Sequence, residues 1–485
     1  MSFTTLTFLL FLVVVFAAHW LARGRVGQNA VVVVASYVFY GWWDPRFCAL
    51  ILASSLLDFA IARALASPDR APARRRGLAA LSCVLNLGLL GVFKYFDFFV
   101  DSAVSLLAGL GLSASAPSLH LILPVGISFY TFQTLGYTID VYRREVEACD
   151  SLLDYLAYVA FFPQLVAGPI ERAGRLLPQL QRERSFDEDR ARDGAKLILW
   201  GFCKKIILAD HLGGFVAQVY DGELVHASGP VLLVATVAFA FQIYCDFSAY
   251  SDIAIGTARL FGVELVRNFA HPYFSQSLDE FWRRWHMSLS TWFRDYVYVP
   301  LGGSRRGPAR FWLSLMATFT LSGLWHGASW TFVIWGAVNG LLVGLSVAFV
   351  GSRRGPDDAP PALLSRAGLA ALPRMLATFT VVCLTWVLFR AVDLPQAMGI
   401  FARVATDIGR AEAWARLSDH AEFLAAFGPL VAMLVMVEWL TRDRAHPLGL
   451  ERWPRPLRWL VYTLLWWILI YLMPDNPDAF IYFQF

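Results

Sequence analysis

Long apolar stretches with few charges recur along most of the chain and constrain its fold more than any other feature. A helix needs roughly 20 mostly apolar residues to cross a bilayer. Only 16% of the 485 residues are charged, whereas a soluble domain carries about 25%. The sequence therefore predicts an all-α polytopic membrane protein, in which helices satisfy the backbone internally. The candidate spans are 3–22, 28–43, 47–65, 77–100, 121–141, 194–209, 229–247, 310–325, 329–350, 369–390, 423–441 and 457–473.

Two further apolar regions, 153–170 and 252–300, are interrupted by Pro, Gly and charged residues. We expect buried or re-entrant helices there, because irregular backbone at membrane depth is tolerated only where protein or a cavity surrounds it. The expected total is about 11–13 membrane-embedded segments. The first apolar run has no preceding basic region, so it is expected to be a retained helix and not a cleaved signal peptide.

The distribution of arginines predicts the orientation in the membrane, since cytoplasmic loops are enriched in Lys and Arg. The loops 101–120 and 210–228 contain no Lys or Arg and are expected outside the cytoplasm. The alternation of loops then places both chain ends outside. We expect one membrane domain over residues 1–473 and an extracytoplasmic tail over residues 474–485.

Two histidines lie inside this apolar sequence, His286 and His326. An ionisable group at membrane depth is costly and is therefore a functional candidate, and histidine is suited to proton transfer near neutral pH. His326 has no Asp, Glu, Lys or Arg near it between Arg310 and Arg353. The alternative is a core histidine satisfied by a backbone carbonyl, but the high cost of burial favours a function for His326.

His286 lies in the densest polar region, close to Arg283, Arg284 and Arg294. One interpretation is a histidine that lines a polar funnel open to the cytoplasm, with these arginines available for the phosphate groups of a bound cofactor. The other is an interfacial amphipathic helix whose cations reach the lipid headgroups. Spacing alone does not decide between them.

Several other classes of site have no support in the sequence. The two histidines lack an HxxxH or HExxH pattern or a carboxylate cluster, so we expect no metal. The six cysteines form no CxxC pair, and a net charge of +4 requires no nucleic-acid partner. There is also no GxSxG, Walker or GxGxxG motif. The polar residues Asp246, Ser248, Ser251 and Asp252 are expected to hydrogen-bond between helices.

The sequence resembles the membrane-bound O-acyltransferase (MBOAT) family, and within it the branch of the alginate O-acetyltransferase membrane subunits. Two of the stretches that carry the resemblance are Phe161-Phe-Pro-Gln-Leu-Val-Ala-Gly-Pro-Ile170 and Gln242-Ile-Tyr-Cys-Asp-Phe-Ser-Ala-Tyr-Ser-Asp252. Cys245 and Ala249 depart from the Phe and Gly of the family. The other stretches are 35–44, 123–133, 281–303 and 323–335.

The resemblance implies an MBOAT fold with a central tunnel, in a bacterial inner membrane. It implies that His326 matches the invariant histidine of the family and His286 the second one. It also implies acetyl transfer from a cytoplasmic donor, acetyl-CoA, toward an extracytoplasmic polysaccharide of the alginate, cellulose or peptidoglycan type. An SGNH-type extracytoplasmic partner would complete the transfer.

The chain ends in a Phe-x-Tyr-x-x-Phe pattern formed by Phe480, Tyr482 and Phe485. This pattern is similar to the end of a small helper peptide in the teichoic acid D-alanylation machinery, whose tyrosine is proposed to carry the acyl group. The resemblance implies that Tyr482 is an acyl relay fused to the acyltransferase. The alternative is an aromatic anchor at the membrane interface, which is the commoner use of such residues.

Two other functions remain as alternatives to this one. A transporter of an acylated lipid or polymer unit would show paired broken helices in two related halves, and no such halves are found in the sequence. An acyltransferase acting on a lipid or a protein would differ in its tunnel walls and in its partner.

Overall fold

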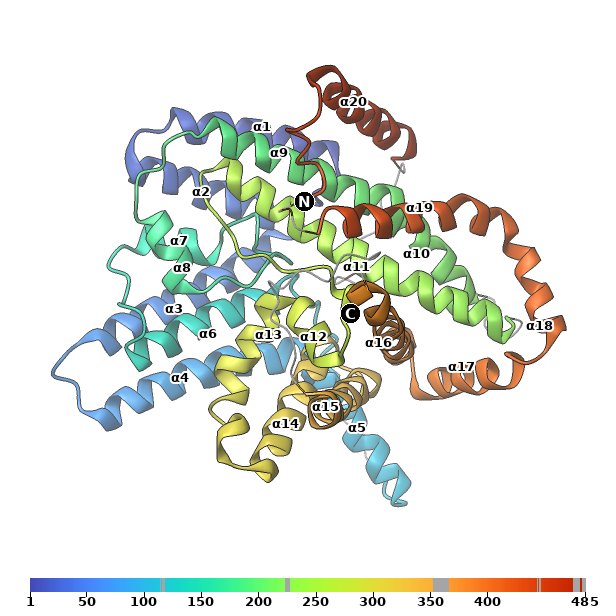
Figure 1. The fold of residues 1–485 in the computed structure, drawn as a ribbon. Helices are drawn as coiled ribbons and strands as arrows, with labels where there is room; N and C mark the ends of the chain where they lie inside the picture. The colour runs from blue at the N-terminus through green and yellow to red at the C-terminus, as the bar shows by residue number, and fades with distance from the viewer. Residues whose placement is uncertain are drawn as a thin grey trace. The chain divides into compact units, whose positions relative to one another are not determined.

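The computed structural model describes residues 1–113, 115, 118–222, 227–351, 366–442, 444, 446–473 and 480–481. These residues form helices joined by turns and loops, and none of them lies in a β-strand (Figure 1). The predicted all-α architecture is confirmed. Tyr482, the predicted relay, lies outside the described residues.

The chain divides into two compact units, Met1–Gly194 with Ala254–Val266, and Ala195–Ile253 with Arg267–Phe485. The first unit holds α1 (Leu6–Leu21), α2 (Gly24–Gly41), α3 (Cys48–Ala66), α4 (Pro72–Leu90), α5 (Phe96–Gly109), α6 (Ile127–Arg143), α7 (Leu152–Val159) and α8 (Ala173–Leu180). Residues of α9 (Glu188–Phe202) and α11 (Gly229–Leu260) belong to both units. The second unit holds α10 (Asp210–Ala217), α12 (Leu278–Arg284), α13 (Met287–Phe293), α14 (Pro308–His326), α15 (Trp330–Val350), α16 (Arg366–Arg390), α17 (Leu394–Asp407), α18 (Ala411–Ala415), α19 (Ala421–Leu440) and α20 (Arg455–Leu472).

Six helical stretches among the described residues are long and apolar enough to cross a membrane, which confirms the polytopic architecture. The shorter apolar helix Leu6–Leu21 is an additional candidate. Embedded segments beyond these, and a single domain over residues 1–473, stay predictions. The six stretches are Pro45–Ala66, Pro72–Gly109, Gly229–Leu260, Trp330–Phe349, Ala370–Arg390 and Ala411–Leu440.

The helix α11 is longer than the sequence predicts, because it continues past residue 247 to Leu260. Polar residues suggested a break in this region, but distant segments supply them with partners. The Lys204 Nζ lies 2.7 Å from the Asp252 carboxylate, and the Asn268 amide donates to the Ser251 hydroxyl at 3.2 Å. Because these groups are satisfied, the helix continues through them.

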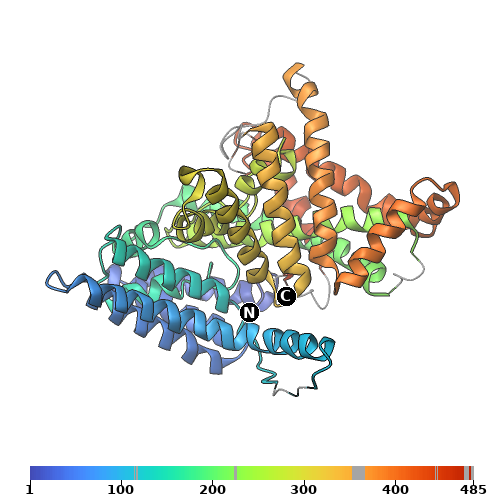
Figure 2. The ribbon, with the colours of Figure 1, turned by 90° about the horizontal axis from the view of Figure 1, so that it is seen from below.

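In the first unit, α3, α4 and α6 lie side by side around a buried polar network (Figures 1 and 2). The Asp58 carboxylate accepts hydrogen bonds from Ser82 on α4 at 2.5 Å and from Asn86 on the same helix at 2.8 Å. Thr134 on α6 donates to the Asn86 amide oxygen at 3.3 Å. Hydrogen bonds of this kind hold helices together where the hydrophobic effect between them is weak.

In the second unit, α14, α15 and α16 lie side by side, and α14 and α15 approach most closely (Figure 2). Two glycines make this approach possible. A Cβ atom at Gly323 would collide with the backbone oxygen of Phe332, and one at Gly336 with the backbone oxygen of Phe319. Small residues at such positions let helix backbones pack directly against each other. His326 is the last residue of α14, so this packing fixes its position.

The close approach of α14 and α15 predicts that Gly336→Ala destabilises the protein. The added methyl group has no space, so the free energy of unfolding should fall by about 1–3 kcal/mol, as in other overpacked cores. Thermal unfolding in detergent, followed by circular dichroism, measures the change. Gly399→Ala on α17 is the matched control, because a Cβ atom there would meet no described atom of another segment within 4 Å. Equal stability of the two variants would contradict the prediction.

Candidate functional site

His326 lies at the end of α14 inside a cage of aromatic rings in the second unit. Its side chain is buried, with 5% of the residue exposed. The rings of Trp325, Trp335 and Phe389 contact the imidazole edge-on at centroid distances of 5.0, 5.2 and 5.2 Å. The next residue, Gly327, has extended backbone and lies so close to the Phe332 ring that a Cβ there would collide with it. The cage therefore fixes the orientation of the imidazole.

His286 connects α12 and α13 and has a left-handed backbone, with φ 44° and ψ 53°. This conformation costs a non-glycine residue about 1–3 kcal/mol and is frequent at functional sites. Asn268 holds the following turn, because its backbone oxygen accepts from Met287 N at 2.9 Å and its side chain accepts from the Ser288 hydroxyl at 2.9 Å. The structure thus compensates the strain at His286 with hydrogen bonds directly after it.

The two histidines share an aromatic neighbour. The Trp325 ring lies 6.0 Å from the His286 ring and 5.0 Å from the His326 ring, measured between centroids. His286 is 1% exposed and lies outside the six candidate spans. Burial lowers the pKa of His286 to about 3, so the ring is neutral near pH 7. A neutral imidazole can orient a ligand through a hydrogen bond but does not supply a positive charge.

The three predicted phosphate-binding arginines have different environments. Arg284 is buried, lies 3.1 Å from the Glu280 carboxylate and donates to the backbone oxygen of Ala270 at 3.2 Å. Arg283 is partly buried and lies 2.6 Å from the Asp279 carboxylate. The Arg294 side chain is 61% exposed and lies 2.8 Å from the Asp295 carboxylate. Of the three, Arg294 is the most accessible to a ligand.

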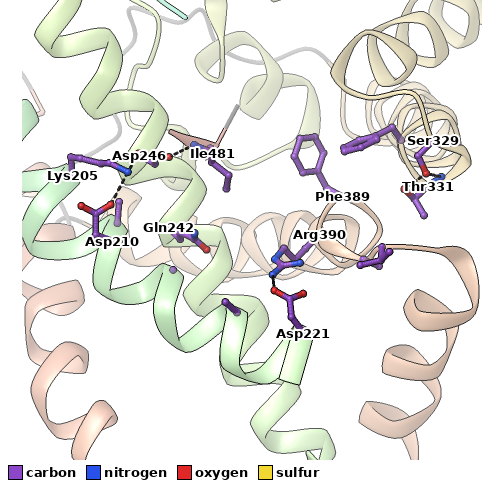
Figure 3. Close-up of a pocket in the computed structure, with 16 residues that line it drawn as sticks. Lys205, Asp210, Asp221, Gln242, Asp246, Ser329, Thr331, Phe389, Arg390 and Ile481 are labelled. Atoms are coloured by element: carbon purple, nitrogen blue, oxygen red, sulfur yellow. Dashed lines mark hydrogen bonds and ion pairs between the residues drawn. The ribbon is translucent and has the colours of Figure 1, made fainter. Parts of the chain in front are cut away.

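A cavity of about 450 Å³ lies in the same unit as the histidines (Figure 3). The end of α16 contributes Phe389 and Arg390, and the segment before α15 contributes Ser329. Its wall includes the buried amide oxygen of Gln242, which has no hydrogen-bond partner among the described residues and can accept from a hydroxyl group of an occupant. Phe389 connects the cavity to the cage around His326, because its ring faces the cavity and contacts the imidazole.

One side of the cavity carries a buried ionic cluster of Lys205, Asp210 and Asp246 (Figure 3). The Lys205 Nζ lies 2.6 Å from the Asp210 carboxylate and 2.9 Å from the Asp246 carboxylate. Lys205 belongs to the π-helical segment Cys203–Ala209, a type of distortion that is frequent at functional sites. Lys205 is not among the functional residues predicted from the sequence, although two consecutive lysines, Lys204 and Lys205, inside an apolar helix are a signal that could have identified it.

The last described residues of the chain reach this cavity. Ile481 lines it, and the backbone N–H of Ile481 donates to Asp246 Oδ2 at 2.7 Å. The Phe480 ring packs on Tyr250 and on Phe247, with centroid distances of 4.7 and 5.8 Å. Ile481 directly precedes Tyr482 in the sequence.

No group of three or more His, Cys, Asp or Glu residues in the described part of the chain is placed to hold a metal ion. The polar lining of the cavity consists of ionic, amide and hydroxyl groups instead. This lining suits an organic ligand with hydroxyl or charged groups.

Comparison with known proteins identifies the family. The sequence pattern of the MBOAT, membrane-bound O-acyltransferase family matches residues 149–350. The chain is 37% identical over 408 residues to the probable alginate O-acetylase AlgI of Pseudomonas aeruginosa, which covers 83% of this chain and 74% of the relative. It is 30% identical over 405 residues to the peptidoglycan O-acetyltransferase of Helicobacter pylori, which covers 78% of this chain and 74% of the relative.

A more distant relative is the teichoic acid D-alanyltransferase of Streptococcus thermophilus, with 28% identity over 290 residues, 55% of this chain and 68% of the relative. The spanning helices and the extent of these matches agree with the resemblance found in the sequence. They favour acyl transfer over transport as the activity. The chain belongs to the membrane-bound O-acyltransferase family and is a multi-pass enzyme of a bacterial membrane.

Proposed function

We propose that this O-acyltransferase takes an acetyl group from cytoplasmic acetyl-CoA and passes it toward an extracytoplasmic polysaccharide. One observation carries the proposal: Phe389, which contacts His326, and Ile481, which precedes Tyr482, line the same cavity. The relatives named for alginate and peptidoglycan support a polymer as the final acceptor. The proposed enzyme is one membrane domain, 1–473, with an extracytoplasmic tail, 474–485.

His326 is the proposed general base. A ring nitrogen of His326 takes the proton of an acceptor hydroxyl, and the oxygen forms a bond with the carbonyl carbon of the acetyl thioester. The carbon–sulfur bond then breaks, and the CoA thiolate takes the proton from His326 and leaves as the thiol. General base catalysis contributes about 10²–10⁴-fold to rates of this kind. His286, which is neutral and contacts the same tryptophan, orients the donor.

Tyr482 is the proposed first acceptor. Its phenol would form an acetyl ester, and an SGNH-type partner would then transfer the acetyl group to the polysaccharide and regenerate the phenol. A phenyl ester is more activated than an alkyl ester, so the second transfer is favourable. The burial of Phe480 and Ile481 in the second unit supports this role over an interfacial anchor, because an anchor would face lipid.

Acetyl-CoA is the proposed donor, and Arg294 is its best candidate phosphate ligand. The exposed guanidinium of Arg294 can exchange Asp295 for a phosphate group at little cost, since exposed ion pairs contribute about 0–1 kcal/mol. Arg283 can contribute if it leaves Asp279. The burial of Arg284 against Glu280 favours a role in holding α12 in place.

His326→Asn is expected to lower acetyl transfer by about 100-fold or more, because the variant lacks the base. The enzyme is assayed in proteoliposomes by the release of CoA, and its amount is measured by immunoblot of the membrane fraction. His120→Asn is the matched control, since His120 is exposed and asparagine tolerates its left-handed backbone. Wild-type activity of His326→Asn would exclude His326 as the base.

Tyr482→Phe removes one oxygen atom and keeps the ring, so it should abolish transfer to the polymer if Tyr482 is the relay. Mass spectrometry of the C-terminal peptide, after incubation with acetyl-CoA without the partner, should detect one added acetyl group on the wild-type chain. Tyr471→Phe on α20 is the matched control, because Tyr471 is 87% exposed. Full activity of Tyr482→Phe would identify Tyr482 as an anchor.

Arg294→Gln is expected to raise the KM for acetyl-CoA about tenfold with little change in kcat, because a hydrogen bond to a charged group contributes about 1.5–3 kcal/mol. Initial rates at a series of acetyl-CoA concentrations measure both constants. Arg416→Gln provides a control with an exposed arginine elsewhere. By contrast, Arg284→Gln should reduce the amount of folded protein, since it leaves Glu280 buried without its partner. An unchanged KM in Arg294→Gln would remove Arg294 from the donor site.

A further inference from the structure

We propose that Asp246 is a positioning residue that binds the backbone of the C-terminal tail and thereby holds the tail at the cavity. The proposal rests on the proposed function in one respect, namely that the tail carries Tyr482 as the acyl relay. The contact itself is independent of that role.

The central contact is the hydrogen bond from the Ile481 N–H to Asp246 Oδ2, at 2.7 Å. Both residues are 3% exposed. The carboxylate binds the main chain, so the contact fixes the position of the tail whatever side chain residue 481 carries. A charged acceptor and a buried site make this a strong type of hydrogen bond.

The charges around Asp246 favour a donor from the tail. Asp246 Oδ1 lies 2.9 Å from the Lys205 ammonium, which also binds Asp210 at 2.6 Å. Among these three side chains one positive charge faces two negative charges. A backbone N–H directed at Asp246 therefore stabilises the cluster, as N–H groups do for buried carboxylates. The cluster holds the tail, and the tail in turn helps to satisfy the cluster.

Next to this hydrogen bond, the Phe480 side chain packs against aromatic rings of α11. Its ring lies 5.8 Å from the Phe247 ring, and the Phe247 ring lies 4.6 Å from the His286 ring. Asp246 and Phe247 are consecutive on α11, so one short stretch of this helix contacts two consecutive residues of the tail. These contacts hold Phe480 and Ile481, the two residues directly before Tyr482. They also place Phe480 near His286, because the Phe247 ring lies beside both.

A second ionic pair on the same two helical segments provides an internal control. Lys204 Nζ lies 2.7 Å from the Asp252 carboxylate, whose side chain is 22% exposed, compared with 4% for Asp246. Neither Lys204 nor Asp252 is among the described residues that line the cavity. Loss of this pair disturbs the same helices without removing the acceptor for Ile481.

The test measures hydrogen exchange at the Ile481 amide of the full-length protein in lipid nanodiscs, by mass spectrometry with residue-level fragmentation. Asp246→Leu removes the acceptor, so the amide should exchange at least tenfold faster than in the wild type. In both Asp252→Leu and Ile481→Val, the amide of residue 481 should exchange within twofold of the wild-type rate. An unchanged exchange rate in Asp246→Leu overturns the proposal.

If Asp246→Leu does not accumulate in the membrane, a second variant, Ile481→Pro, tests the contact between Asp246 and Ile481. Ile481→Pro removes the N–H donor at a residue outside the six candidate spans, so acetyl transfer should fall at least tenfold. Wild-type transfer in Ile481→Pro, together with loss of transfer in Tyr482→Phe, overturns the proposal. Tyr482→Phe separates this inference from the relay, because it leaves the Ile481 amide protected. If Tyr482→Phe is active while protection still depends on Asp246, the relay is wrong and the positioning contact stands.

Discussion

Charged groups buried in an apolar protein need partners of opposite charge, and the second unit is built on two such pairs. Lys204 and Lys205, adjacent in a π-helical segment, bind Asp252 and Asp246 on α11. Loss of one partner from a buried pair typically costs about 3–5 kcal/mol, because a charge is left without compensation. The two pairs therefore fix α11 against the lysine segment. They also direct Gln242, one helical turn before Asp246, toward the cavity.

Aromatic packing complements these ionic contacts at the histidines. Rings surround His326 on several sides, and Trp325 links it to His286. The Trp and Phe rings exclude water and carry no titratable group. The imidazoles are therefore the groups among these rings that can transfer a proton. Glycines on α14 and α15 let the rings and helices approach this closely.

The sequence predicted the helical membrane architecture well, because apolar runs report it directly. It also singled out His326, since one ionisable residue in a long apolar stretch is conspicuous. It did not predict that Phe389, far along the chain, contacts His326, because that pairing arises from helix packing. Arg284 was expected among the phosphate ligands from its position alone, whereas its environment is a buried ion pair with Glu280. The helix α11 is longer than predicted for the same reason, because the partners of its polar residues, such as Lys204 and Asn268, lie far away in the sequence.

The hydrogen bond between Asp246 and Ile481 joins two parts of one polypeptide, and this has a thermodynamic consequence. Binding of a separate peptide would cost the loss of translational and rotational freedom, several kcal/mol at ordinary concentrations. A segment of the same chain is present at an effective concentration that does not depend on dilution. The hydrogen bond of Ile481 and the packed ring of Phe480 can therefore suffice to keep the segment bound most of the time. Because the contact is non-covalent, the segment can dissociate and rebind, as the proposed acyl relay requires of a carrier that meets two reaction partners in each cycle.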